Sequence, residues 1–269
     1  MNDESAPAGN ETGTGKRSYN VPAAEKALDI LEFMAGQVGG LTATEIATQL
    51  GRSVHEVYRL LTVLEARGYL YQRKPSDGYR LSLKLFDLAH RMPSVRRLSD
   101  SALDVMQGLA PDTLQSCHLG VLSGHEFLIV LQVDNPLPMR YSVVLGAKFD
   151  FSQTSGGTVL FAHAGEGTRQ SLLDWMRNGG AEDGGAQEIE ARAERIRATG
   201  YEMRQSLTVS GVTNIAAPIF DHQGRAVAAL TLPYMPQRAA TVSIEAARDR
   251  VLEATRAISR NLGADVAGG

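Results

Sequence analysis

The chain has 269 residues, of which 43% are hydrophobic and 21% are charged, and its formal net charge is -3. This length and composition are typical of a globular protein with room for two domains, each with its own core. No segment is long and apolar enough to suggest a membrane span. The single cysteine, Cys117, excludes a disulfide within the chain and is typical of a protein of the reducing cytoplasm.

The charge is divided unevenly along the chain. From Lys16 to Arg97 there are 13 Lys or Arg against 8 Asp or Glu, whereas residues 98–269 hold 14 against 19. A basic N-terminal module favours a polyanionic partner, because the release of counterions drives phosphate binding. The first 15 residues are acidic, rich in small residues and without the apolar region of a signal peptide. We expect disordered tails at residues 1–18 and 264–269.

A first helix is predicted from Val21 to Ala35. Asn20 is its cap candidate, and Pro22 falls in the first turn, where proline is tolerated. The apolar stripe expected to face the core consists of Ala24, Ala27, Leu28, Leu31 and Ala35.

A second helix is expected to start at about Thr42, which precedes Glu45 by three residues. A hydroxyl at the N-cap and a carboxylate at this spacing satisfy two free amides of the first turn. Ile46 and Leu50 keep one face apolar, and Gly51 provides the left-handed residue that ends a helix at little cost.

The third helix repeats this pattern, with Ser53 and Glu56 at its start and Gly68 at its end. Its apolar positions recur at helical spacing and are Val57, Leu60, Leu61 and Leu64. Tyr69–Arg73 and Tyr79–Leu83 then alternate apolar and polar residues around the turn Pro75-Ser76-Asp77-Gly78, which predicts a hairpin. Two helices joined at a glycine are also common in proteins that do not bind DNA. The hairpin and the basic charge, however, favour a winged helix-turn-helix at residues 19–82 that binds double-stranded DNA.

A linker helix is expected from Leu83 to Arg91, ending near Pro93, within a linker at residues 83–94. A further helix should run from about Val95 to Leu109 and stop at Pro111. It opens a second domain, residues 95–263.

The second domain has the pattern of an α+β sensor. One hairpin is predicted from His118–Leu122 and Phe127–Val133 around Ser123-Gly124, and a second from Ile215–Phe220 and Ala226–Leu232. The other expected elements are a strand at Met139–Leu145, a loop at Gly146–Gly157, and helices at Thr158–His163, Thr168–Arg177, Glu188–Thr199 and Ser243–Leu262.

Three motifs in this order resemble the IclR family of bacterial transcriptional regulators. They are Val57-Tyr58-Arg59-Leu60-Leu61, Gly78-Tyr79-Arg80-Leu81, and Gly211-Val212-x-x-Ile215-Ala216-Ala217-Pro218-Ile219-Phe220-Asp221-x-x-Gly224. The resemblance covers about Val21 to Leu262. It implies an N-terminal winged helix, a C-terminal domain related to GAF and PAS folds that binds a small metabolite, and a homodimer or homotetramer on a palindromic operator.

The N-terminal residues of a recognition helix approach base edges in the major groove. Ser53, His55, Tyr58 and Arg59 are therefore candidates for DNA contact, together with Thr42 and Arg52, whereas Arg73, Lys74 and Arg80 on the wing are expected to meet phosphates. Two alternatives stay open: Arg59 is merely solvated, or Tyr58 packs against the first helix.

The chain departs from the family at Val54-His55-Glu56, where a Lys-Ser-Thr run is usual. Glu56 would repel phosphate unless it caps the helix with Ser53 or accepts a hydrogen bond from cytosine. Capping is the favoured interpretation.

The resemblance implies an effector pocket between the sheet and the loop that leads into the helix near Thr158. Lys148, Thr154, Ser155 and Gly156 in that loop suit a carboxylate, which favours a small organic acid. Asn214 stands where many relatives have cysteine, and Thr231 stands where serine is frequent. The open alternative is that Lys148 is solvated and the glycines only turn the chain.

Enzymatic function is not expected. The six histidines show no metal-ligand spacing, and the chain has no nucleophile elbow, P-loop or dinucleotide fingerprint. Cys117 and His118 are neighbours in a predicted strand, so their side chains point to opposite faces. We therefore expect no cofactor and no metal. The alternative function is a GAF-like metabolite-binding or catalytic protein whose N-terminal module serves only dimerisation.

Overall fold

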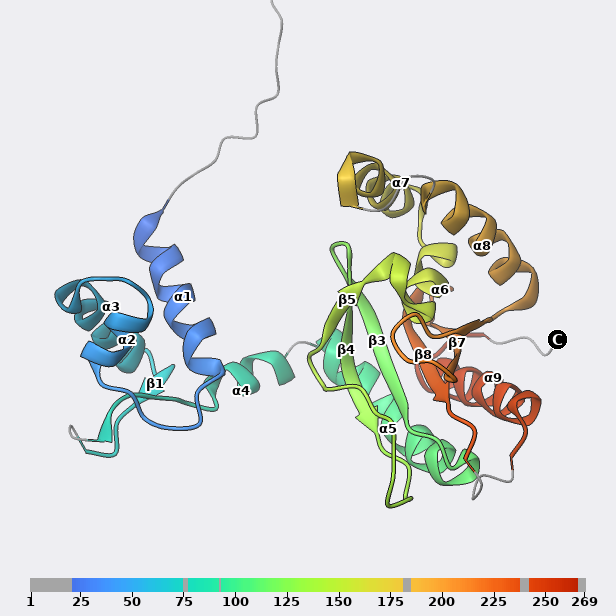
Figure 1. The fold of residues 1–269 in the computed structure, drawn as a ribbon, viewed down its shortest axis with the longest axis horizontal. Helices are drawn as coiled ribbons and strands as arrows, with labels where there is room; N and C mark the ends of the chain where they lie inside the picture. Colours follow the sequence, from blue (N-terminus) through green and yellow to red (C-terminus); the bar gives the residue numbers. More distant parts are fainter. Residues whose placement is uncertain (1–20, 75–76, 92, 181–184, 238–241, 266–269) are drawn as a thin grey trace, which may run out of the picture. The chain divides into compact units, whose positions relative to one another are not determined.

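The computed structural model describes residues 21–74, 77–91, 93–180, 185–237 and 242–265 (Figure 1). The chain divides into two compact units, Met1–Ala89 and His90–Gly269. The predicted tail at 1–18 and the last four residues of the tail at 264–269 lie outside the described residues.

Three helices and a small hairpin form the first unit: α1 (Pro22–Ala35), α2 (Ala43–Gln49), α3 (Val54–Ala66), β1 (Leu70–Tyr71) and β2 (Arg80–Leu81). The capping box of α2 is confirmed, because Thr42 accepts from the Glu45 amide and the Glu45 carboxylate accepts from the Thr42 amide. Gly51 and Gly68 have φ of 63° and 76°, as the two predicted helix ends require.

The face of α1 that packs against the core differs from the predicted stripe. Ile30, Leu31 and Met34 are buried, whereas Leu28 is 56% exposed and Ala24 and Ala35 are also exposed. The larger side chains at 30 and 34 bury more apolar surface than the alanines do, so the helix turns them inward. The N-cap is Val21, and Asn20 lies outside the described residues.

The hairpin is shorter than predicted, with only the pairs Leu70↔Leu81 and Tyr71↔Arg80, extended by a bridge between Leu41 and Tyr79. Pro75 and Ser76 of the predicted turn lie outside the described residues. Gly78 has φ of 71°, and a Cβ there would clash with the backbone of Leu41. This glycine lets the wing lie directly against the segment before α2.

Two helices follow the hairpin. The linker helix α4 (Lys84–His90) ends earlier than predicted, and Pro93 begins α5 (Pro93–Thr113), where its missing N–H costs nothing. The predicted stop of this helix at Pro111 is wrong. α5 continues to Thr113, whose hydroxyl donates to the Leu109 carbonyl at 2.8 Å and so satisfies an acceptor of the last turn.

The second unit is built on an antiparallel sheet in the order β5-β4-β3-β8-β7-β6. The strands are β3 (Cys117–Ser123), β4 (Glu126–Val133), β5 (Lys148–Asp150), β6 (Glu202–Gln205), β7 (Thr213–Phe220) and β8 (Ala226–Tyr234). Both predicted hairpins, β3–β4 and β7–β8, are confirmed.

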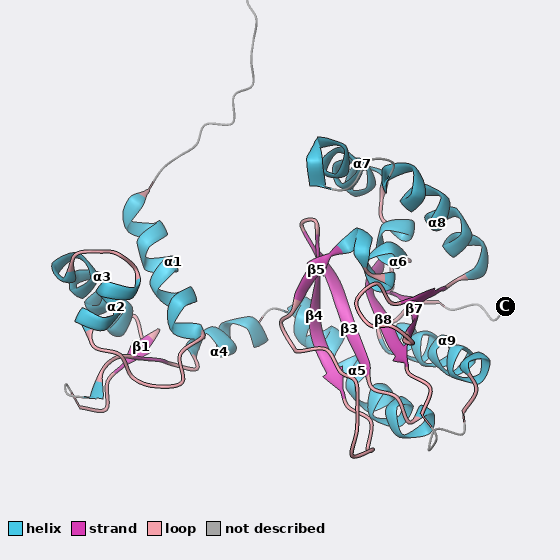
Figure 2. Cartoon of the chain, in the orientation of Figure 1, coloured by secondary structure: helices cyan, strands magenta, loops and turns pink. Residues whose placement is uncertain are grey.

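Helices cover both faces of this sheet (Figure 2). α5 and α9 (Ile244–Asn261) pack on one face with Cys117, Ile215 and Leu230. α6 (Ser155–His163), α7 (Glu166–Trp175) and α8 (Gly185–Thr199) cover the other with residues such as Phe127 and Ala216. A kinked turn (Met176–Gly180) follows α7. Alternate residues of β7 and β8 therefore enter two different cores.

Three predictions for this unit are wrong. Residues 139–145 form no strand, because β5 occupies the edge of β4 and Ile129 bonds instead to Gly146 and Ala147. Met139 is 80% exposed and Val144 76% exposed. α6 begins at Ser155 rather than Thr158, because Thr154 caps it, and the predicted loop at Gly146–Gly157 contains strand β5. Strand β6 was not predicted.

Candidate functional site

The outer face of α3 is the candidate DNA-binding surface of the first unit. His55, Tyr58 and Arg59 are all exposed, and so is Ser53, whose hydroxyl caps the helix by accepting from the Glu56 amide. Tyr58 is 56% exposed, so it does not pack into the core with the first helix. Thr62 lies one turn further along the same face and is also exposed.

Two ion pairs fix the start of α3 to α1. Arg52 pairs with Asp29, and Glu56 pairs with Lys26, which lowers the pKa of the Glu56 carboxyl through the hydrogen bond from that ammonium group. The expected capping role of Glu56 is therefore only half correct. Its amide is capped by Ser53, but its carboxylate is held by Lys26 instead of reaching back to the N-cap.

The other cations of the predicted DNA surface lie on the wing. Arg73 and Lys74 are exposed beside the turn, and Arg80 is half-buried in β2. Thr42 is exposed at the start of α2, although its hydroxyl is shared with Glu45 at 2.8 Å. The exposed side chains of α3 and the cations of the wing thus lie in the same unit, Met1–Ala89, and that unit contains most of the basic part of the sequence.

The second unit contains a cavity of about 320 Å³. β3, β7 and β8 supply His118, Asn214 and Thr231, and the turn into α6 with the first two residues of that helix supplies residues 153–156. The loops around 141–143 and 206–208 close its sides. Among the described residues that line this cavity there is no Lys, Arg, Asp or Glu. The site suits a small molecule held by neutral donors and apolar surface.

Two polar side chains on the sheet point into this cavity without a partner. His118 and Thr231 are directly opposite each other on β3 and β8, and His118 Nδ1 and Thr231 Oγ1 are buried with no hydrogen-bond partner among the described residues. Burial lowers the pKa of His118 to about 4, so the imidazole is neutral near pH 7. Unpaired buried polar atoms are costly, and a ligand that bonds to both would remove that cost.

The first turn of α6 forms the opposite wall. The Thr154 hydroxyl accepts from the Gly157 amide at 3.0 Å, whereas the amides of Ser155 and Gly156, at the first two positions, have no acceptor within the helix. Amides at this end of a helix attract anions. A Cβ on Gly156 would enter the ring of Phe127, so glycine is required for this close approach to the sheet.

Five of the six predicted effector residues line the cavity: Thr154, Ser155, Gly156, Asn214 and Thr231. Lys148 does not, because it points to the Glu126 carboxylate at 2.9 Å from the neighbouring strand. His118 was missed as a pocket residue, although the opposite directions of Cys117 and His118 were predicted correctly. Cys117 lies in the α5 and α9 core, and burial raises its pKa to about 12.

Within the part of the chain that the structure describes, no three His, Cys, Asp or Glu residues are grouped as a metal site. The described helices also include none that is long and apolar enough to cross a membrane.

Both parts of the chain match family models. Residues 90–260 match the model described as Bacterial transcriptional regulator IclR C-terminal, and residues 23–74 match the IclR helix-turn-helix domain. The HTH-type transcriptional regulator BhcR of Paracoccus denitrificans is 30% identical over 259 residues, which cover 94% of this chain and 92% of that protein. The regulator XynR of Escherichia coli is 27% identical over 246 residues, which cover 90% and 98%.

Solved structures give the same result. The Thermotoga maritima IclR structure is 26% identical and matches with a TM-score of 0.68 over 89% of this chain and 98% of that one. An IclR homolog from Microbacterium hydrocarbonoxydans, complexed with 4-hydroxybenzoate, matches with a TM-score of 0.73 at 20% identity over 90% and 99%. The second likeness supports the fold alone.

Proposed function

The chain belongs to the IclR family of bacterial transcriptional regulators and is a DNA-binding transcriptional regulator, and from this premise we propose that it controls a catabolic operon in response to a small organic acid. The acid binds in the cavity of the second unit. The protein acts as a homodimer or homotetramer on a palindromic operator, in the cytoplasm.

The observation that carries the effector proposal is the pair of unpartnered groups, His118 Nδ1 and Thr231 Oγ1, in a cavity that is also lined by the start of α6, where the amides of Ser155 and Gly156 have no acceptor within the helix. A carboxylate is held at the α6 amides, and a hydroxyl or the second carboxylate oxygen bonds to the sheet residues. Asn214 adds an amide on the same face of the sheet. Lys148 is not needed, because the helix end and neutral donors provide the positive potential.

For DNA we propose that His55, Tyr58, Arg59 and Thr62 approach base edges, with Ser53 at the start of the helix. Arg73, Lys74 and Arg80 on the wing contact phosphates, and Thr42 contacts the backbone near the start of α2. Arg52 is held by Asp29. It reaches DNA only if that ion pair opens, so its proposed role is to fix α3.

The effector is tested by a thermal-shift screen of the intact protein with benzoate, 4-hydroxybenzoate, glycolate and lactate, since a ligand of the folded state raises its melting temperature. The structure of the Microbacterium homolog motivates the second acid. We expect one of these acids to bind, and we expect both Asn214→Ala and Thr231→Val to weaken it at least tenfold, because each removes a buried hydrogen bond.

Lys148→Ala is the matched control, since it removes a charge near the cavity without touching its lining. It should leave the acid affinity unchanged. A large loss of acid affinity in Lys148→Ala, with none in Asn214→Ala, would indicate a site at the outer edge of the sheet and contradict the proposal.

The DNA part is tested by titrating the protein on duplex at several salt concentrations. The logarithm of affinity should fall steeply with the logarithm of salt, and the slope should become shallower by about one in Arg73→Ala or Lys74→Ala if each contacts a phosphate. The alternative, an N-terminal module that serves only dimerisation, predicts no measurable affinity for duplex even in dilute salt.

A further inference from the structure

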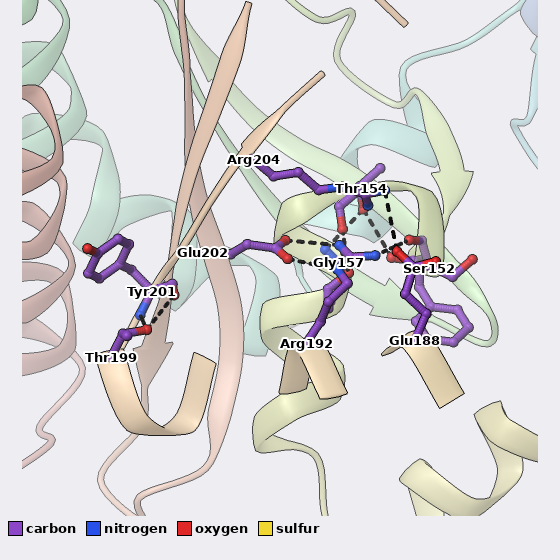
Figure 3. A network of polar contacts seen from close by, with 11 residues as sticks. Ser152, Thr154, Gly157, Glu188, Arg192, Thr199, Tyr201, Glu202 and Arg204 are labelled. Carbon is purple, nitrogen blue, oxygen red and sulfur yellow. Dashed lines mark hydrogen bonds and ion pairs between the residues drawn. The ribbon is translucent and has the colours of Figure 1, made fainter. Parts of the chain in front are cut away.

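A buried ion pair lies behind the effector cavity and outside its lining. Arg192 on α8 and Glu202 on β6 have side chains only 6% and 9% exposed. Arg192 Nε donates to Glu202 Oε1 at 2.8 Å, and Nη2 donates to Oε2 at 3.1 Å (Figure 3). This two-pronged geometry is the strongest that a guanidinium and a carboxylate adopt.

The same guanidinium also contacts the chain on both sides of the cavity wall. Nη1 donates to the Ser152 carbonyl at 3.1 Å, and Nη2 donates to the Thr158 hydroxyl at 2.7 Å. Between these two residues lies the segment 153–156, all four residues of which line the cavity. Thr158 connects Arg192 to the cavity lining, because its hydroxyl also donates to the carbonyl of Thr154 at 2.9 Å.

Glu202 ties this wall to the other side of the cavity. It lies in β6 opposite Ala216 of β7, and β6 leads into Ser206–Thr208, which also line the cavity. A second ion pair joins the same two elements, because Arg204 Nη2 of β6 lies 3.8 Å from Glu188 Oε1 of α8. One ion pair therefore joins α8, the start of α6 and the strand before the 206–208 loop.

We propose that Arg192 and Glu202 are positioning residues that fix the first turn of α6 at the distance from the sheet that effector binding requires. The inference rests on the proposed effector function of the cavity. A purely stabilising role does not explain the arrangement, because a buried ion pair is usually no more stabilising than apolar side chains of similar size. Apolar side chains cannot donate to Ser152 and Thr158, so they would lose the two hydrogen bonds that tie this wall to α8 and β6.

The test separates positioning from stability in the intact protein. The double variant Arg192→Met/Glu202→Leu replaces the ion pair by apolar side chains of similar volume and should keep the melting temperature within a few degrees. Hydrogen–deuterium exchange in peptides covering Thr154–Leu160 should nevertheless become at least tenfold faster. Exchange in β7 and β8 should stay unchanged. The matched control is Arg96→Gln/Asp100→Asn, which removes an exposed ion pair of α5 and should change neither region.

Thr158→Val keeps the ion pair and removes only the hydroxyl that accepts from Arg192. This variant therefore tests the positioning role if the double variant does not fold. It should speed exchange in the same peptides. Unchanged exchange in Thr154–Leu160 in a folded double variant, or in Thr158→Val, overturns the inference.

A second arm measures the affinity of the double variant for 4-hydroxybenzoate and the other three acids, where a loss of at least tenfold is expected. If none of these acids binds the unmodified protein, the proposed effector class fails, while the exchange experiment still decides whether the pair positions the wall. An acid that binds the double variant with unchanged affinity contradicts the link to effector binding.

Discussion

His118 illustrates how burial alone sets the chemistry of a side chain. Its pKa is lowered to about 4 because the ring is desolvated, whereas an unfolded chain has a histidine pKa of about 6.5. Between these values the unfolded state binds a proton that the folded state does not. The folded state is therefore most favoured above about pH 6.5, and that contribution is lost as the pH falls toward 4.

We expect the melting temperature of the second unit to fall as the pH is lowered from about 7 to 4.5, and we expect His118→Gln to reduce this dependence. His163, whose pKa is also lowered by burial, should account for part of the remaining slope. The measurement is calorimetry over this pH range. An identical slope in His118→Gln would mean that the ring is solvated.

At this scale the sequence predicted neutral polar residues of the pocket correctly but was wrong about Lys148, which does not line it. Thr154, Ser155 and Asn214 reach the cavity because a helix start and a strand face direct them there. Lys148 does not, because its direction depends on Glu126 of the neighbouring strand, a contact that no local pattern indicates. His118 was missed for the same reason, since its importance arises only from Thr231 on another strand.

Among the elements, the contact between α6 and the sheet depends on two glycines. A Cβ on Gly120 of β3 or on Gly156 of α6 would in each case enter the ring of Phe127. The ring thus fills the space between strand and helix, with no room for a methyl group on either side. Glycine here is required by packing, since neither residue has a positive φ.

We expect Gly156→Ala to destabilise the second unit by about 1–3 kcal/mol through overpacking, and to weaken acid binding because the α6 wall must shift. Gly108→Ala is the control. Gly108 is exposed on α5 with no atom near the added Cβ, and alanine is the better helix former, so stability should be unchanged or slightly raised. Urea denaturation measures both, and equal effects of the two substitutions would contradict the packing argument.

Element prediction succeeded where local chemistry decides and failed where a partner decides. The capped starts of α2 and α3 and the two hairpins of the second unit were found correctly. The apolar pattern at Met139–Leu145 resembles a strand, but β5 takes the sheet edge that it would need. β6 has the sequence Glu-Met-Arg-Gln and no apolar alternation, so only its pairing with β7 makes it a strand.

For the whole molecule, the uneven division of charge along the sequence accompanies a division of the chain into two compact units. The core of the first unit consists of α1–α3 and the hairpin, and those of the second lie on the two faces of its sheet. Each unit therefore has the buried apolar surface needed for its own cooperative transition.

We expect two thermal transitions in the intact protein. The single tryptophan, Trp175, lies on α7 and reports only the second unit, whereas calorimetry detects both. An acid present at 100 times its dissociation constant should stabilise the second unit, whose unfolding Trp175 reports, by about 2.7 kcal/mol. A mixed-sequence duplex in dilute salt should raise the melting temperature of the first unit only. One transition common to all probes would contradict the division into two units.

Adding both ligands to the intact protein then measures the free energy of coupling between the acid and the duplex. We expect about 1–3 kcal/mol for a regulator whose effector changes its affinity for DNA.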